Sequence, residues 1–183
     1  MRSIWSETCS GGNLYPSLKG EVRADAAIIG GGMAGILTAH QLKQAGLKTV
    51  VLEAERIGGG QTKNTTAKIT SQHGLFYHNL ASKKGRDTAR LYLMANQRAV
   101  EEYARIVGKE GIDCDFERTD AYVYGQEEEI LRQEAEVAKM LGAPASYVSQ
   151  IEIPVPNKGA VRFADQACFH PTKFVKGLAS RLD

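Results

Sequence analysis

Two short apolar runs, separated by an amphipathic stretch, stand out near the start of the chain. Residues 26–29 (AAII) and 49–52 (TVVL) have the composition of short buried strands. Between them, Ile36 and Leu42 lie on the apolar side of a helical pattern, and Gly46 follows as a residue that typically ends a helix. The pattern therefore predicts a strand–helix–strand unit of about 30 residues, the βαβ motif of parallel sheets.

The middle of the chain has the apolar period of a longer helix. Over Asp87–Val107, apolar residues that include Leu91 and Met94 recur at three- and four-residue steps, which predicts an amphipathic helix with these side chains in the core. The first residue of this range is the expected N-cap, and Gly108 or Gly111 is the expected end.

Shorter elements are predicted around this helix. The acidic run Glu127–Glu129 suits the first turn of one of them, where negative charge complements the helix dipole, and it is better explained as a solvated face than as a metal cluster. We expect an irregular amino-terminal arm over 1–23 with Trp5 and Tyr15 as packing anchors, a short helix flanked by His73 and His78, strands over 116–124 and 155–163, and helices over 126–141 and from His170-Pro171 onward.

The turn after the first strand carries the most specific chemistry. Gly30, Gly32 and Gly35 have the spacing G-x-G-x-x-G, and Glu53 follows at the end of the second strand. The first glycine allows a sharp turn, the second lets a pyrophosphate approach the backbone, and the third lets the helix pack close to the strand. The helix beginning near Met33 presents free N–H groups to phosphates. An acid at the second strand end accepts ribose hydroxyls, so FAD or NAD is favoured over NADP.

A long polar segment follows Glu53. Gly58–Gly60 precede Thr62, Thr65 and Thr66 in a predicted loop of about 16 residues, and ordered loops of this length are usually functional. Exposed backbone N–H groups and hydroxyls suit phosphates, a ribityl chain or a flavin edge. The alternative is a solvated surface loop.

Composition narrows the class of protein. The chain has 183 residues, is 43% hydrophobic and 24% charged, and has a formal net charge of +2, which is ordinary for a globular protein and does not suggest nucleic-acid binding. Its three cysteines without a C-x-x-C pair argue against a disulfide framework or a metal site. We expect a cytoplasmic protein without a signal peptide or a membrane span, and homo-oligomerisation stays open.

A resemblance covers most of the chain. Residues 25–70 are similar to the amino-terminal FAD site of the D-amino-acid oxidase-like flavoproteins, which include glycine and sarcosine oxidases. Four later runs resemble a bacterial subgroup that carries a carboxyl-terminal Rieske iron–sulfur domain, and the chain resembles the amino-terminal half of such a protein. These runs are TTAKITSQHG (65–74), IDCDF (112–116), AYVYG (121–125) and AVRFADQACFHP (160–171).

The resemblance implies an α/β fold in which a Rossmann-like FAD/NAD(P)-binding βαβ unit carries an inserted, partly helical and truncated portion of a substrate domain. The expected FAD-binding domain comprises 1–82 and 166–183, and the expected substrate domain 83–165. The resemblance places Glu53 at the ribose, Arg56 near the pyrophosphate and the segment Thr65–Lys68 near the isoalloxazine. The predicted FAD-contact residues are Gly30, Gly32, Met33, Ala34, Gly35, Glu53, Ala54, Arg56, Gly60, Gln61, Thr62, Thr65, Thr66, Ala67 and Lys68.

The implied function is FAD-dependent oxidation of an amine or amino-acid C–N bond by hydride transfer to flavin, with electrons passing to oxygen or to an electron-transfer partner. No residue has a spacing that identifies a catalytic base. Two alternatives stay open: an NAD-binding dehydrogenase domain, and a nucleotide-binding remnant or assembly subunit without turnover.

Overall fold

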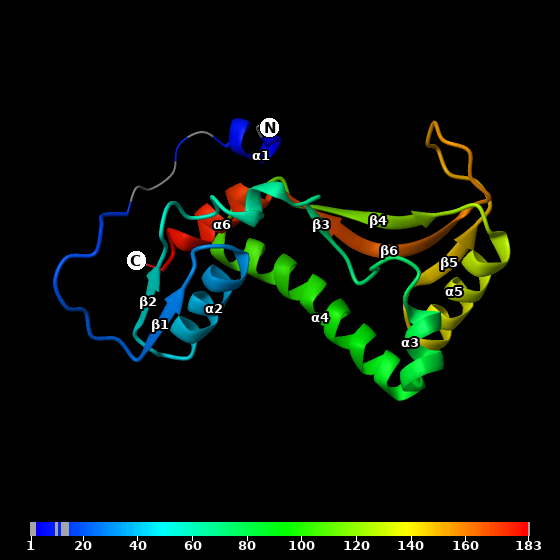
Figure 1. Ribbon diagram of the computed structural model, residues 1–183, viewed down its shortest axis with the longest axis horizontal. Helices are drawn as coiled ribbons and strands as arrows, with labels where there is room; N and C mark the ends of the chain where they lie inside the picture. The colour runs from blue at the N-terminus through cyan, green and yellow to red at the C-terminus, as the bar shows by residue number, and fades with distance from the viewer. Residues whose placement is uncertain (1–2, 10, 12–14, 183) are drawn as a thin grey trace. The chain divides into compact units, whose positions relative to one another are not determined.

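The computed structural model describes residues 3–9, 11 and 15–182, which form two compact units (Figure 1). The first unit comprises residues 1–67, 106–116 and 169–183, and the second comprises 68–105 and 117–168. The chain therefore leaves the first unit twice and returns to it twice. Among the described residues, no helix combines the length and apolarity that crossing a membrane requires.

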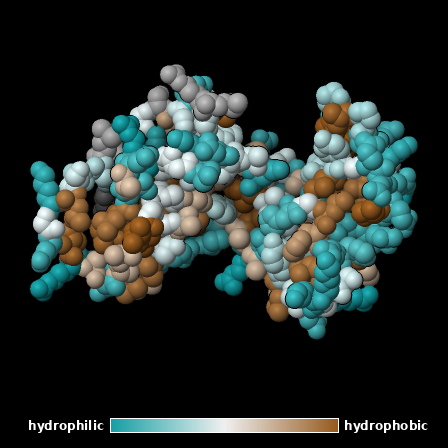
Figure 2. All heavy atoms as spheres, viewed as in Figure 1, coloured by the Kyte–Doolittle hydropathy of each residue, from teal (hydrophilic) through white to brown (hydrophobic). Residues whose placement is uncertain are grey.

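The first unit contains the predicted βαβ motif. Strands β1 (Ala26–Ile29) and β2 (Thr49–Leu52) pair in parallel, with Ala26 opposite Thr49. Helix α2 (Met33–Gln44) connects them, as a parallel pair requires. Ile36 is buried, as its period predicts. Ile29 is 90% exposed and lies in the region of β1 and β2, where Figure 2 shows apolar side chains in brown.

Helix α6 (Pro171–Ala179) completes the first unit and packs against α2. Proline occupies its first turn, where its missing N–H costs nothing, and His170 is the N-cap. The side chains Phe174, Val175 and Leu178 are buried. The helix start and its buried side are as the sequence predicts.

The amino-terminal segment differs from the expected irregular arm. Residues Ile4–Glu7 form one helical turn, α1, and the Ser3 hydroxyl accepts a hydrogen bond from the Trp5 N–H at 3.3 Å. A serine cap of this kind satisfies a backbone donor that the first turn cannot pair. Tyr15 is 42% exposed and is not a packing anchor. The rest of the expected arm includes residues 1–2, 10 and 12–14, which lie outside the described residues.

The second unit is built around one antiparallel sheet. The central strand is β6 (Ala160–Cys168), which pairs along its length with β4 (Glu117–Tyr124). On its other side β6 pairs with β5 (Ala145–Val148) and then with the two-residue strand β3 (Lys68–Ile69). The strand predicted over 116–124 is confirmed.

The helices α3 (Tyr77–Lys84) and α5 (Glu128–Leu141) supply much of the core of this unit. The rings of Tyr77 and Phe163 stack with centroids 5.9 Å apart, which adds to the area that burial removes from water. The buried core residues are Tyr77, Ala89, Leu93, Leu131, Ala135, Ala138, Leu141, Ala143, Ala145, Val161 and Phe163.

The long middle helix begins earlier than predicted, and only some of the apolar residues of the predicted range, Ile106 among them, are buried. Helix α4 spans Arg86–Glu110, so Asp87 lies in its first turn instead of capping it. Leu91 and Met94 are 68% and 56% exposed, whereas Leu93 and Val100 are buried. Apolar residues occur on both sides of this helix, so the period alone did not identify the buried side.

The ends of several other elements also differ from expectation. Of the two expected ends of α4, Gly108 lies inside the helix, whereas Gly111 follows its last residue with a φ of 60°, as predicted. The strand expected over 155–163 is β6, which begins only at Ala160, and the strand β5 was not predicted. His78 lies within α3, and Glu127 is the N-cap of α5 rather than a first-turn residue. The start of β6 and the strand β5 depend on pairing between strands that are distant in sequence, which local composition does not contain.

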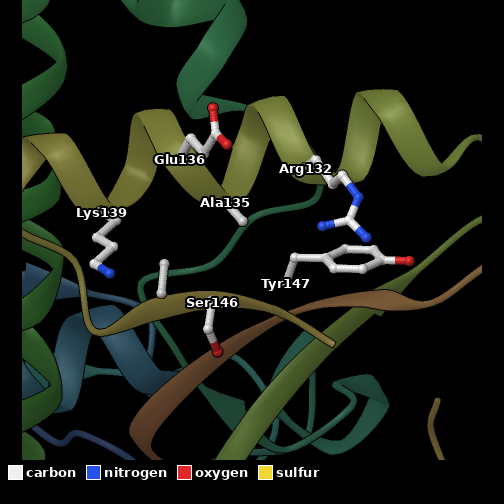
Figure 3. A pocket seen from close by; sticks show the side chains of 7 residues that line it. Arg132, Ala135, Glu136, Lys139, Ser146 and Tyr147 are labelled. Carbon is white, nitrogen blue, oxygen red and sulfur yellow. The ribbon is translucent and has the colours of Figure 1, made fainter. Parts of the chain in front are cut away.

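A shallow pocket of about 180 Å³ lies between α5 and β5 (Figure 3). The Arg132 guanidinium stands over the ring of Tyr147, 4.0 Å from its centroid, and also donates to Glu128. Ser146 points to the side of β5 away from α5. The main charge in the pocket is therefore already engaged by the protein, and we assign these contacts to packing of helix against strand.

A buried carboxylate organises the start of α3. The Glu134 side chain on α5 is 2% exposed and accepts hydrogen bonds from the backbone N–H groups of Phe76, Tyr77 and His78 at 2.7–2.8 Å. These are donors that the first turn of a helix leaves unpaired. The sequence showed only one more glutamate in an acidic helix, so this role was missed.

We expect Glu134→Ala to lower the free energy of unfolding by about 3 kcal/mol or more, because three buried N–H groups would lose a charged acceptor. Glu134→Gln keeps one acceptor oxygen and should cost less. Chemical denaturation followed by far-ultraviolet circular dichroism measures both. The matched control is Glu136→Ala on the exposed side of the same helix, which should change stability by less than about 0.5 kcal/mol. Equal effects at the two positions would contradict this role of Glu134.

Candidate functional site

The glycine turn joins β1 to α2. Gly30 has a φ of 104°, which favours glycine, and its N–H donates to the Leu52 carbonyl at 2.8 Å. A Cβ built on Gly35 would lie 1.9 Å from the Gly30 carbonyl oxygen. No side chain fits between these atoms, so the close approach of helix and strand requires glycine at position 35.

Gly32 is the N-cap of α2. Neither its backbone conformation nor the packing around it requires a glycine at this position. Its φ of −84° is open to any residue, and the nearest heavy atom to a built Cβ is the Thr62 hydroxyl oxygen at 3.5 Å, an ordinary contact. The space beside this glycine therefore suits a group that must approach the backbone closely. A pyrophosphate at the N-terminus of a helix is such a group.

Glu53 lies at the end of β2 and faces the glycine turn. Its Oε2 accepts from the Gly31 N–H at 2.7 Å and its Oε1 from the Glu55 N–H at 2.9 Å. These backbone donors lower the pKa of the carboxyl. The ionised form therefore adds stability above the unfolded-state pKa and loses this effect as the pH falls through the folded-state pKa. The exposed carboxylate keeps lone pairs for a further donor, such as a ribose hydroxyl.

The segment after Glu53 is more ordered than the predicted polar loop. The Gly58 N–H donates to the Gly31 carbonyl at 2.9 Å, which fastens this segment to the glycine turn. The 3₁₀ turn η1 (Gln61–Asn64) follows. Its Thr62 side chain is buried and accepts from the Met33 N–H at 3.2 Å. The segment thus contributes a hydroxyl directly at the N-terminus of α2.

Residues Thr65–Ala67 continue along the edge of the first unit. The Thr65 hydroxyl accepts from the Ala67 N–H at 3.3 Å. Ala67 is buried and has a φ of 61°, an uncommon conformation for a residue with a Cβ. Its carbonyl accepts from the Phe169 N–H at 3.3 Å. Lys68 is exposed and begins β3 in the second unit.

The structure brings the predicted residues together to different degrees. Gly30, Gly32, Gly35, Glu53 and Thr62 converge through the contacts above. The predicted contacts Ala34, Ala54, Arg56, Gly60, Gln61, Thr66 and Lys68 are exposed, Met33 is half-buried, and their contact with a cofactor stays a prediction.

Trp5, which was expected to be a packing anchor, lies beside this site together with His170, and the sequence did not predict this position for either residue. Trp5 donates from its indole Nε1–H to the Thr65 carbonyl at 2.9 Å, and its ring meets that of His170 edge to face, with centroids 5.0 Å apart. These residues are far apart in the chain, so spacing could not reveal the contact. The single tryptophan in a polar arm was the one available signal.

The comparison with protein families decides the class to which this site belongs. The profile described as FAD dependent oxidoreductase, DAO, matches residues 25–183. The chain belongs to this family of FAD-dependent oxidoreductases. The predicted family and the predicted cofactor, FAD, are thereby confirmed, and the resident group of the family agrees with the space beside Gly32 and the carboxylate of Glu53.

Individual relatives of the DAO family agree with this result. The chain is 36% identical over 171 residues to the putative Rieske 2Fe-2S iron-sulfur protein YhfW of Bacillus subtilis (strain 168). The aligned region covers 92% of this chain and 34% of that protein. The chain thus spans about a third of the length of this curated relative.

Solved structures share the fold at low identity. L-proline dehydrogenase from P. horikoshii superposes with a TM-score of 0.67 and 18% identity, covering 87% of this chain and 41% of that chain. Glycine oxidase from Bacillus cereus ATCC 14579 superposes with a TM-score of 0.62 and 20% identity, covering 87% and 44%. The predicted α/β fold class is confirmed.

We expect Gly35→Ala to destabilise the first unit by at least about 2 kcal/mol, because the new Cβ would force helix and strand apart. Thermal or chemical unfolding followed by Trp5 fluorescence, which reports on this unit, measures the loss. The control is Gly108→Ala in α4, where a Cβ meets no heavy atom within 4 Å and helix propensity favours alanine by about 0.5–1 kcal/mol. A stable Gly35→Ala variant would show that the βαβ packing tolerates a wider separation.

Proposed function

We propose that this chain supplies the dinucleotide-binding part of an oxidoreductase that oxidises an amine or amino-acid C–N bond, with FAD as hydride acceptor. The observation that carries the proposal is the arrangement at the N-terminus of α2. There the Glu53 carboxylate accepts a hydrogen bond from the glycine turn, and the Thr62 hydroxyl accepts one from the first turn of the helix. A backbone hydrogen bond joins the segment before Thr62 to the same turn. The family assignment supports the oxidoreductase class.

The pyrophosphate is the part of FAD whose place is best supported. Helix α2 carries no acidic residue in its first turn, so its positive dipole end is not compensated by a neighbouring carboxylate on the same helix. We propose that Gly32, Met33 and Ala34 present backbone N–H groups to the phosphates, and that Glu53 accepts hydrogen bonds from the adenosine ribose. The Thr62 hydroxyl holds the Met33 N–H and can reorient toward a phosphate oxygen as a donor.

We propose further roles for residues around this turn. Arg56 would add positive charge near the pyrophosphate, and Lys68 would place a charge near the flavin ring, where it would stabilise the reduced anion. Residues 1–82 and 166–183 are proposed as the FAD-binding domain and 83–165 as part of the substrate domain. The further proposed contacts are Gly30, Gly35, Ala54, Gly60, Gln61, Thr65, Thr66 and Ala67.

The bound flavin supplies the hydride chemistry, and the residues of this chain bind and orient it. Glu53 and the glycine turn set the position of the adenosine end. Structures similar to this chain include those of L-proline dehydrogenase and glycine oxidase, which supports an amine or amino acid as the substrate class. The relative named as a Rieske 2Fe-2S iron-sulfur protein supports an iron–sulfur carrier as the electron acceptor.

Gly32→Ala tests the site with little disturbance of the fold. A Cβ at this position meets only an ordinary contact, so we expect the unfolding free energy to fall by no more than about 1 kcal/mol, the preference of an N-cap for glycine over alanine. We also expect FAD affinity to fall at least about tenfold, because the methyl group would occupy space that a pyrophosphate needs. The visible absorption spectrum after addition of FAD and desalting, together with titration of flavin fluorescence, measures the binding.

The parent chain should retain the visible bands of flavin in this experiment, and Gly108→Ala should bind FAD as the parent does. A colourless parent chain after desalting, with no change in flavin fluorescence, would reject FAD binding by this chain. Equal affinity of Gly32→Ala and the parent would reject the proposed place of the pyrophosphate while leaving FAD binding elsewhere. NAD added in place of FAD tests the alternative cofactor in the same titration.

A further inference from the structure

The one-turn helix α1 holds the backbone of the segment that precedes β3. The Trp5 indole N–H donates to the Thr65 carbonyl at 2.9 Å, and the Ser3 hydroxyl donates to the Lys63 carbonyl. Both acceptors lie in or directly after η1. The side chain of Trp5 in α1 and that of its N-cap Ser3 thus fix two carbonyl groups of a segment that is about 60 residues away in sequence.

The same turn is fastened on its other side to α6. The His170 Nδ1 accepts from the Lys173 N–H at 3.2 Å, which leaves the ring proton on Nε2. That nitrogen donates to the Thr8 hydroxyl at 2.9 Å, and the hydroxyl in turn donates to the Ile4 carbonyl at 2.6 Å. Burial, followed by the positive charge of Lys173, lowers the pKa of His170, so this chain of donors is intact at neutral pH.

The held segment reaches the N-terminus of α2. Between the carbonyls that α1 fixes and the glycine turn lies Thr62, whose hydroxyl accepts from the Met33 N–H at 3.2 Å. A 3₁₀ turn of four residues makes few hydrogen bonds of its own, and ordering each residue costs about 1–2 kcal/mol. Contacts that order the segment before a ligand arrives therefore increase affinity for that ligand.

We propose that α1 is a strap that pre-orders the FAD-binding segment 61–67, with Trp5 and Thr8 as positioning residues that do not touch the cofactor. This inference rests on the proposed function and extends it to a part of the chain before the βαβ unit. The strap links three places: the segment after Gly60, the cap of α6 and, through Thr62, the first turn of α2.

Trp5→Phe tests the contact to the segment, because phenylalanine keeps an aromatic ring beside His170 while it removes the N–H donor and part of the area of the indole. We expect the dissociation constant for FAD to rise about fivefold, the effect of one lost hydrogen bond. Without FAD, the amides of residues 61–67 should exchange hydrogen faster than in the parent chain, as measured by mass spectrometry. The control is Ser6→Ala, an exposed position on the same turn, which should change neither quantity.

Thr8 allows a rescue experiment on the other side of the strap. Thr8→Val replaces the hydroxyl by a methyl group of similar size and should also weaken FAD binding about fivefold and speed exchange over residues 61–67. Thr8→Ser restores the hydroxyl and should return both quantities to the parent values. If the substitutions only reduced overall stability, the unfolding midpoints of Thr8→Val and Thr8→Ser would both fall. FAD affinity and exchange over residues 61–67 would then not recover in Thr8→Ser.

The experiments distinguish a failure of the proposed strap from a failure of the proposed FAD site. Parent-like exchange over residues 61–67 in both Trp5→Phe and Thr8→Val would overturn the strap, whatever the chain binds. Faster exchange in the variants together with parent-like FAD affinity would also overturn it. In that case the strap would order the segment, but this order would not increase the affinity for FAD. A parent chain that binds no FAD would reject the proposed function and, with it, the role of the strap in flavin binding.

Discussion

The first unit depends on the distance between the backbone of β1 and the first turn of α2. A Cβ at Gly35 would lie 1.9 Å from the Gly30 carbonyl oxygen, so the approach exists only because position 35 has no side chain. This approach brings the helix N-terminus beside the strand end, where Glu53 reaches the Gly31 N–H and Thr62 reaches that of Met33. A wider separation would remove these contacts together, because each spans only one hydrogen bond.

Two helix N-termini in this chain are treated in opposite ways. The first turn of α3 is buried, and the Glu134 carboxylate takes its N–H groups. The first turn of α2 carries no acidic residue, and its Met33 N–H donates to the neutral hydroxyl of Thr62. A charged side chain thus completes one helix end within the protein, whereas the first turn of the other has a neutral partner, which is the arrangement that anion binding at a helix N-terminus requires. This difference supports a structural role for Glu134 and a ligand-binding role for the glycine turn.

Segments outside the βαβ unit contact the residues that follow the glycine-rich stretch. The turn α1 contacts carbonyl groups of the segment 63–65, and His170 joins that turn to the cap of α6. These contacts connect the amino-terminal residues, the glycine-rich segment and the last described helix of the first unit. The family relationship over residues 25–183 explains the βαβ unit, while the contacts of Trp5 and Thr8 come from residues before that range.

The sequence by itself determined the elements whose signals are local. The apolar runs on either side of a G-x-G-x-x-G turn, the acid after the second run, and the proline that starts α6 each act within a few residues, so their spacing is sufficient to predict them. The same signals predicted which residues of the turn would face a cofactor and indicated which family the chain resembles. They could not show how the later segment returns to that turn.

Only the tertiary structure decided features that depend on a distant partner. Helix α4 buries Leu93 and Val100 instead of Leu91 and Met94, because packing selects one side of a helix that has apolar residues on both. The strand β6 begins at Ala160, where β4 and β5 offer it hydrogen bonds. Glu134 and Trp5 acquired their roles in the same way. Their hydrogen-bond partners lie about 56–60 residues away, and a contact over that separation leaves no pattern in the local sequence.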